Sequence, residues 1–213
     1  MRIIVTAGPT REYIDDVRFI SNASSGRMGY AVAGAAAAAG HEVTLLAGPV
    51  ALPDVPGCRV VRIVSVDDLR AALAERFGQC DALVMTAAVG DFRPERRVAG
   101  KIPRAGGPVT IQFVPTEDVL AAVTAGKRPG QVVVAFAVEA LAPAEAADKA
   151  QAEMRRKGAD FVVVNGPEAM ESADSAACML DREGEVLAWA RRPKEELGRE
   201  IVRIIERASG SKL

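Results

Sequence analysis

Short apolar runs alternate with longer segments of helical period along most of the chain. The apolar runs predict strands at 3–7, 43–46, 59–63, 82–88, 109–114, 131–136 and 161–165. The helical segments between them are 27–39, 66–77, 116–124 and 144–157. Strands that alternate with helices are joined by crossovers, which cover the faces of a parallel sheet. We therefore expect an α/β, Rossmann-like fold with a mostly parallel sheet and helices on both faces.

The pattern changes near the C-terminal end of the chain. Apolar runs at 176–181 and 186–190 flank a polar turn at 182–185, which predicts an antiparallel hairpin. An amphipathic helix is expected to follow, from 194 to 208. No internal repeat and no change of composition marks a linker, so residues 1–213 are expected to form a single domain.

A glycine-rich helix start follows the first predicted strand only after a long polar insertion. Gly8 ends the strand, and the helix opens later, within the sequence SSGRMG at 24–29. Gly26 and Gly29 would let a phosphate approach the helix N-terminus, where free N–H groups and the helix dipole favour an anion. An insertion of this length inside a compact domain indicates a functional loop.

Ligands of open parallel sheets bind beyond the carboxyl ends of the strands, so the loops at those ends are the candidate site. These loops follow Ala7, Ala88, Phe136 and Val164. The second of them continues into a polar segment at 95–104 that contains glycine and proline and has little helical period. We expect this segment to be a mobile flap whose lysine reaches a developing negative charge while water is excluded.

Composition excludes several classes of protein. With 213 residues, 49% of them hydrophobic, the chain can supply a full core. A net charge of −1 and a pI near 6.0 provide no basic field for nucleic acid, which we do not expect as a partner. Three cysteines without a C-x-x-C pair argue against a disulfide framework and a zinc site. No signal peptide or membrane span is evident, and a cytoplasmic location is expected.

Each candidate residue also has an ordinary structural interpretation. Ser24 or Ser25 could cap the helix that follows, and Arg18 could pair with Asp15 or Asp16 at the surface. In the same way, Asp91 could cap a turn, Lys101 could be solvated, Phe136 could belong to the core, and His41 could be structural. The functional interpretation depends on the convergence of these weak signals on one edge of the sheet.

Several motifs together resemble a known family. They are VTAGPTRE at 5–12, DVRFISNASSGRMG at 16–29, AAVGDFRP at 87–94, KI at 101–102, VVAFAVE at 133–139 and KGADFVVVN at 157–165. In these motifs, and over nearly its whole length, the chain resembles the phosphopantothenate-cysteine ligases (phosphopantothenoylcysteine synthetases) of coenzyme A biosynthesis. In bacteria such ligases are commonly fused behind a flavin-binding decarboxylase. That half is absent here, so the chain looks like a stand-alone ligase or an excised domain, for which a separate decarboxylase is a possible partner.

The resemblance implies a reaction in two steps. The carboxylate of 4'-phosphopantothenate first displaces pyrophosphate from a nucleoside triphosphate, usually CTP in bacteria and ATP in eukaryotes. The amino group of L-cysteine then displaces the nucleotide and forms an amide. Mg²⁺ and the flap residue Lys101 would neutralise the phosphates in the first step. The side-chain amide of Asn22 would stabilise the oxyanion in the second step.

The resemblance also assigns residues to each ligand. The implied nucleotide-binding residues are Gly8, Ser24, Gly26, Gly29, Ala87, Asp91, Lys101, Asp118, Phe136 and Lys157. The implied substrate-binding residues are Arg18, Asn22, Ala87, Ala88 and Asp91. Arg18 is expected to reach the substrate of a neighbouring subunit, so a homodimer is expected. No carboxylate cluster has diagnostic spacing, and the metal ligands are not assigned.

The sequence departs from the family pattern at three places. The usual lysine four residues before Lys157 is Glu153, N-P-D or T-P-D has become T-E-D at 116–118, and SSGKMG has become SSGRMG. Arg27 keeps the charge of the replaced lysine, whereas Glu153 reverses it. Lys149 or Arg156 is the candidate replacement for the missing cation, and the choice between CTP and ATP is left open.

Two other functions are compatible with a strand-glycine-helix opening. A nicotinamide-dependent short-chain reductase would need a Tyr-x-x-x-Lys pair, but neither Tyr13 nor Tyr30 has a lysine four residues later. A non-catalytic nucleotide-binding module is the second alternative, and it is suggested by the reversed charge at Glu153.

Overall fold

The computed structural model describes residues 1–104, 107–170 and 172–210. Its main sheet has eight strands in the order β12-β11-β10-β9-β6-β1-β4-β5. The parallel strands are β1 (Arg2–Ala7), β4 (Glu42–Ala47), β5 (Cys58–Arg62), β6 (Ala82–Met85), β9 (Val132–Val138) and β10 (Phe161–Asn165). The antiparallel hairpin is formed by β11 (Asp174–Leu180) and β12 (Glu185–Pro193). The predicted α/β, mostly parallel fold with a C-terminal hairpin is confirmed.

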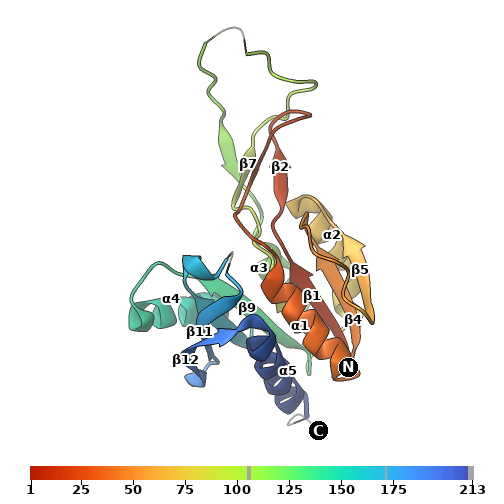
Figure 1. Ribbon diagram of the computed structural model, residues 1–213, viewed down its shortest axis with the longest axis vertical. Coiled ribbons are helices and arrows are strands. Elements are labelled where there is room, and N and C mark those ends of the chain that lie inside the picture. The colour runs from red at the N-terminus through yellow and green to blue at the C-terminus, as the bar shows by residue number, and fades with distance from the viewer. Residues whose placement is uncertain (105–106, 171, 211–213) are drawn as a thin grey trace.

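Helices cover both faces of the sheet (Figure 1). One face carries α1 (Arg27–Ala38) and α5 (Lys194–Gly210). The opposite face carries α2 (Val66–Arg76), α3 (Val119–Thr124) and α4 (Pro143–Arg156). Two short 3₁₀ segments, η1 (Phe77–Gln79) and η2 (Pro167–Ala169), complete the connections. No helix in the described part of the chain is long and apolar enough to cross a bilayer.

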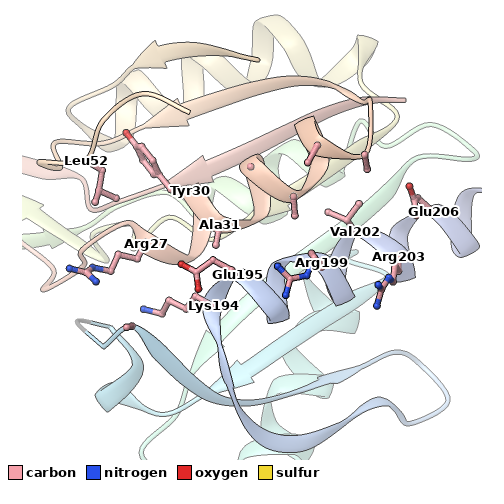
Figure 2. Close-up of a pocket in the computed structure, with 15 residues that line it drawn as sticks. Arg27, Tyr30, Ala31, Leu52, Lys194, Glu195, Arg199, Val202, Arg203 and Glu206 are labelled. Atoms are coloured by element: carbon pink, nitrogen blue, oxygen red, sulfur yellow. The ribbon is translucent and has the colours of Figure 1, made fainter. Parts of the chain in front are cut away.

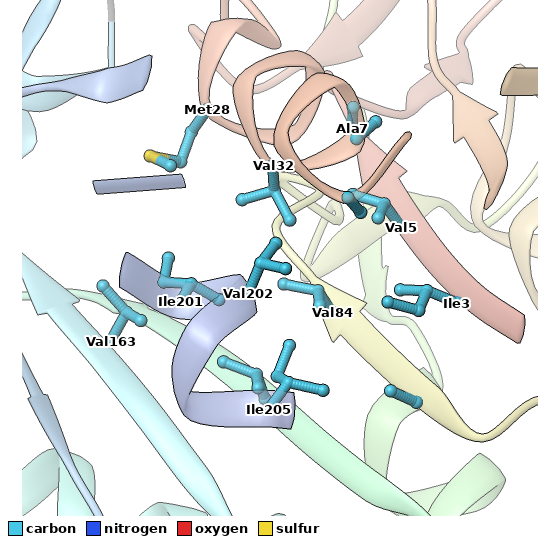
Figure 3. Close-up of a cluster of buried hydrophobic side chains, with 14 of the residues drawn as sticks. Ile3, Val5, Ala7, Met28, Val32, Val84, Val163, Ile201, Val202 and Ile205 are labelled. Atoms are coloured by element: carbon cyan, nitrogen blue, oxygen red, sulfur yellow. The ribbon is translucent and has the colours of Figure 1, made fainter. Parts of the chain in front are cut away.

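The alternation of side chains along β1 divides the core into two layers. Ile3 and Val5 are buried beneath α1 and α5, whereas Ile4 is buried on the α2 side. Figure 3 shows the first layer, in which Val32 of α1 and Val202 of α5 meet above the strands. Near-continuous apolar strands such as β6 are typical of sheets buried on both faces, which explains why the strand pattern was readable in the sequence.

The long insertion and the predicted flap together form an arm that projects beyond the carboxyl ends of the strands (Figure 1). We define the arm as residues 11–21, 92–104 and 107–115. It contains a hairpin of β2 (Arg11–Tyr13) and β3 (Phe19–Ser21) and a second pair of β7 (Phe92–Pro94) and β8 (Phe113–Pro115). The insertion that was expected as a functional loop thus contains a hairpin, in which Tyr13 packs edge-on against Phe19 and provides a small apolar contact.

Several predicted boundaries need correction. The strand expected at 109–114 is reduced to β8 and pairs only with β7 in the arm, outside the main sheet. The strand expected at 82–88 ends at Met85, and the helix expected from 116 begins at Val119 because the Asp118 side chain caps it. Neither Ser24 nor Ser25 caps α1, whose N-cap is Gly26. At the start of α2, Ser65 and Asp68 form a capping box.

Candidate functional site

Two adjoining cavities lie at the carboxyl ends of β6, β9 and β10, where the topology predicts a ligand crevice. The larger has a volume of about 420 Å³ and the smaller about 90 Å³. Ala87 and Phe136 line both, so the two cavities adjoin, and together we call them the crevice. Phe136 is only partly buried, and its ring both packs on the core and borders the crevice.

The larger cavity brings together five residues that the family resemblance assigns to the nucleotide. They are Ala87, Asp91, Asp118, Phe136 and Lys157. Asp118 accepts the Ala121 N–H at 3.1 Å as the cap of α3 and lies 3.4 Å from the Lys157 Nζ. Burial alone would raise the pKa of Asp118, but the Ala121 hydrogen bond and the Lys157 charge lower it below its usual value. Asp118 therefore holds Lys157 at the cavity wall as a carboxylate.

The reversed charge at Glu153 has a cationic partner in Lys157. Glu153 also lines the larger cavity, where its carboxylate lies 3.6 Å from the Lys157 Nζ. Arg156 lines the same cavity, and its guanidinium lies 3.3 Å from Asp118. Lys149 instead pairs with Glu139 at 2.9 Å and is not among the lining residues. Of the two candidates for the missing cation, Arg156 is the one that the structure brings to the crevice.

The smaller cavity contains the start of α1. Ser24, Gly26, Gly29 and Ala88 line it. Gly26 has a φ of 74°, a conformation that favours glycine, and a side chain there would meet Val50 at 2.9 Å. Gly8 lies behind this turn, with its Cα 3.3 Å from the position of a Gly26 Cβ. The glycines thus leave the first N–H groups of α1 open to the crevice, as an anion requires.

Asn22 lies at the rim of the crevice. Its Nδ2 donates to the carbonyl oxygen of Val89 at 3.0 Å, and Val89 lines the larger cavity. This bond joins the insertion before α1 to the loop after β6, and it fixes which edge of the amide is presented. Three of the predicted substrate-binding residues, Ala87, Ala88 and Asp91, therefore line the crevice, and a fourth, Asn22, is hydrogen-bonded at its rim.

Arg18 and Lys101 lie away from this group, on the arm. The Arg18 guanidinium donates to the carbonyl oxygen of Ile102 at 2.8 Å, which places it beside the segment that carries Lys101. Lys101 is exposed and lines neither cavity of the crevice. Within one chain, the structure does not bring Lys101 to Asn22 or to the tip of α1.

Asp15 fixes the shape of the arm. Its side chain has no exposed surface, and it accepts N–H groups of Val17 at 2.8 Å, Arg18 at 2.6 Å and Ile102 at 3.1 Å. Loss of hydration would raise the pKa of Asp15, but these hydrogen bonds and the Arg18 charge lower it overall. The interpretation of Arg18 as a simple surface ion pair is therefore incomplete, because the Asp15–Arg18 pair binds the flap to the hairpin.

Two further polar residues at the smaller cavity were not found from the sequence. Asn165, at the end of β10, is 8% exposed, and its Oδ1 has no hydrogen-bond partner among the described residues. Lys194, at the start of α5, is 3% exposed. The apolar strand before Asn165 was the available signal for the first. Nothing in the local pattern distinguishes Lys194 from a solvated lysine.

No group of three or more histidine, cysteine, aspartate or glutamate side chains in the described residues could hold a metal ion by itself. The crevice has carboxylates in Asp91, Glu117, Asp118 and Glu153, and the Lys157 ammonium lies between the last two. A donor set of this kind suits a cation that arrives with phosphate oxygens, as Mg²⁺ commonly does, better than a preformed protein cage.

Comparison with known proteins identifies the family. The model of the DNA/pantothenate metabolism flavoprotein C-terminal domain matches residues 1–208. The chain belongs to this family. A solved structure, the C-terminal domain of the coenzyme A biosynthesis bifunctional protein CoaBC, is 34% identical with a TM-score of 0.78, covering 97% of this chain and 94% of that one. The resemblance to the ligase half of the bifunctional flavoprotein, expected from the motifs, is confirmed.

Two curated relatives show how the family domain occurs in longer proteins. The bifunctional protein CoaBC of Mycobacterium bovis is 45% identical over 172 residues, which are 77% of this chain and 41% of that protein. A cysteine/cysteine sulfinic acid decarboxylase from an unspecified prokaryote is 38% identical over 209 residues, 96% of this chain and 57% of that protein. The chain thus spans about half the length of these relatives.

Proposed function

We propose that this family member joins 4'-phosphopantothenate to L-cysteine through an acyl-nucleotide intermediate, with CTP as the preferred nucleotide. The observation that supports this most directly is the crevice of two adjoining cavities. Phe136, Asp118 and Lys157 line the larger cavity, the tip of α1 lines the smaller one, and the Asn22 amide is hydrogen-bonded to Val89 at the rim. The larger cavity would bind the nucleoside, the tip of α1 would bind the anionic leaving group, and the Asn22 amide would lie near the acyl carbon.

In the first step, a carboxylate oxygen of 4'-phosphopantothenate bonds to the α-phosphorus and the bond to pyrophosphate breaks. The nucleoside would occupy the larger cavity between Phe136 and Asp118, with its phosphates directed toward Gly26. The free N–H groups of α1 and the nearby cations would stabilise the charge that develops on pyrophosphate. Mg²⁺ would be held chiefly by the phosphate oxygens and would neutralise part of the same charge.

In the second step, the cysteine nitrogen bonds to the acyl carbon, the nucleoside monophosphate leaves, and the nitrogen loses a proton. The acyl oxygen becomes negative as the nitrogen adds. Asn22 has a second N–H on the nitrogen that donates to Val89, and this group is oriented by that bond. We assign it to the oxyanion. The small side chains of Ala87 and Ala88 leave space for the pantothenate chain.

We also propose that the working form is a homodimer in which the arm of one copy closes the crevice of the other. The arm exposes a set of apolar side chains: Val17, Phe19, Ile20, Phe92, Val98, Val109 and Phe113. A surface of this kind on a thin projection marks a protein interface. Pairing of two arms would carry Arg18 and Lys101 to the partner's substrate, which a single chain does not achieve.

The direct test is an assay for pyrophosphate. The purified protein would be incubated with 4'-phosphopantothenate, Mg²⁺ and either CTP or ATP, and pyrophosphate would be measured before and after L-cysteine is added. We expect release with CTP before cysteine is present, and amide product only after its addition. Lys101→Gln should abolish pyrophosphate release. Arg104→Gln, on the same arm, is the matched control and should release pyrophosphate as the wild type does.

Absence of pyrophosphate with both nucleotides, in a protein that still binds CTP, would instead support the non-catalytic nucleotide-binding module. A preference for NADPH in thermal-shift measurements would support the reductase, because only ligands of the native protein raise its melting temperature. The single-domain organisation, the cytoplasmic location and the separate decarboxylase partner stay predictions.

A further inference from the structure

Lys194 lies where the crevice meets a second, larger hollow. A groove of about 710 Å³ runs between α1 and α5, and Arg27 and Lys194 line both this groove and the small cavity at the tip of α1. Figure 2 shows the two side chains at one end of the groove, extending in the same direction. The close approach of the helices buries Lys194. Gly198 allows this approach, because a side chain there would meet the Ala31 carbonyl oxygen at 2.9 Å.

The Lys194 ammonium is buried with too few partners. Its Nζ donates to the carbonyl oxygen of Ala169 at 2.6 Å, which uses one of three N–H groups. No carboxylate oxygen of the described residues lies within 4.0 Å of it. Burial lowers the pKa of Lys194, the charge of Arg27 lowers it further, and Glu195 raises it. A buried cation without an anion is costly, and evolution usually provides a partner for it.

The missing partner is expected on the side of the small cavity. Ala169, which accepts from Lys194, lines that cavity together with Gly26 and Gly29. The unpartnered Oδ1 of Asn165 lines it as well. The cavity therefore combines a buried cation, the N-terminus of a long helix and a free acceptor. A bound phosphate satisfies the first two of these groups.

We propose that Lys194 is a phosphate-binding residue that holds the terminal phosphates of the nucleotide and then the pyrophosphate that leaves. This inference rests on the proposed function for the identity of the ligand, but it concerns binding and can be tested without turnover. Arg27 faces the same anion from α1. Two like charges that repel each other in the empty protein would be neutralised when the phosphates bind.

A purely structural role for Lys194 is the competing explanation. Its bond to Ala169 fixes the 3₁₀ turn η2, and the next carbonyl, that of Met170, accepts the Ser25 Oγ–H at 2.7 Å. Loss of Lys194 could therefore disturb the start of α1 indirectly. Lys194→Gln separates the two roles, since glutamine can still donate to Ala169 but has no charge. Lys194→Arg keeps the charge.

The experiment measures the affinity of wild-type protein, Lys194→Gln and Lys194→Arg for inorganic pyrophosphate, CTP and uncharged cytidine by calorimetry. We expect Lys194→Gln to bind pyrophosphate and CTP at least about tenfold more weakly, as for loss of a hydrogen bond to a charged group, with cytidine unchanged. Lys194→Arg should recover most of the loss. Equal pyrophosphate affinity in wild type and Lys194→Gln, or an equal loss for cytidine, would overturn the proposal.

A measurement on the wild-type protein covers the case in which Lys194→Gln fails to fold. The ¹⁵N resonance of the Lys194 ammonium, assigned by its absence in Lys194→Arg, should shift as pyrophosphate is added; an unchanged resonance at saturation contradicts direct binding. A protein that binds pyrophosphate through Lys194 but forms no amide would retain this inference and refute ligation.

Discussion

Asn22 depends on one hydrogen bond, to the Val89 carbonyl oxygen, for its orientation. Asn22→Asp replaces the donor by a carboxylate that repels both this carbonyl and the developing oxyanion. We expect amide formation to slow on the order of 10²–10³-fold, the usual cost of losing an oxyanion donor, while pyrophosphate release is much less affected. Single-turnover measurements of the two products separate the steps.

Ser21→Ala provides the comparison for Asn22→Asp. Ser21 precedes Asn22, and its hydroxyl donates to the Thr10 carbonyl oxygen at 2.7 Å, within the insertion rather than toward the crevice. This variant should leave the ratio of the two steps unchanged. An equal loss of both steps in Asn22→Asp would refute the separate role assigned to the amide.

Single residues also mark the limit of what the sequence can predict. Gly26, Asp91 and Phe136 could be assigned because the motifs around them are specific, and the structure places all three at the crevice. Lys194 could not, because its burial results from the packing of α5 against α1 and η2, which lie far away in the sequence. The contact of Arg18 with the segment that carries Lys101 could not be predicted for the same reason.

The first turn of α1 packs so closely on the sheet that it tolerates only glycine at one position. A Cβ at Gly29 would meet the Ala7 Cβ, the Thr86 Oγ1 at 2.5 Å and the Thr6 carbonyl oxygen at 2.8 Å. Gly29→Ala is expected to destabilise the fold by about 1–3 kcal/mol through overpacking. It should also weaken CTP binding, because the helix tip would move away from the crevice.

Gly34→Ala is the matched control on the same helix. A Cβ at Gly34 would make only an ordinary contact, 3.7 Å from Val55, so the higher helix propensity of alanine should stabilise the fold by roughly 0.5–1 kcal/mol. Denaturant midpoints at unchanged m-value measure both effects. Destabilisation of similar size in the two variants would show that α1 rejects alanine for reasons other than contact with the sheet.

Predictability differed among the elements for a physical reason. Strands such as β9 and helices such as α2 carry their own patterns, which are apolar runs and capping signals. The hairpin of β2 and β3 has neither. β2 and β3 are three residues each and are held by contacts between segments, such as the Arg11 guanidinium 4.4 Å from the centre of the Phe19 ring. The apolar alternation at 109–114 does include a strand, β8, but the sequence did not indicate that this strand pairs with β7 in the arm.

The arrangement of the whole molecule separates the predicted catalytic residues. Asn22 belongs to the crevice, whereas Lys101 belongs to an arm that hydrogen bonds hold away from it: the Asp16 carboxylate and main chain both bond to Gly100. If a symmetric dimer unites them, each complete site contains Asn22 of one copy and Lys101 of the other. The alternative is that the flap detaches and closes over its own crevice.

Mixing two defective variants distinguishes these arrangements. Alone, Asn22→Asp would form the amide on the order of 10²–10³-fold more slowly than wild type, and Lys101→Gln would form none. In a mixed dimer with shared sites, one site carries both substitutions and the other site carries neither. Since about half of the dimers in an equal mixture are mixed after subunit exchange, the mixture should recover about a quarter of the wild-type rate. If Lys101 acts within its own chain, every site keeps one defect and no activity returns. Light scattering on the same samples must show dimers; monomers with full activity would refute the shared site outright.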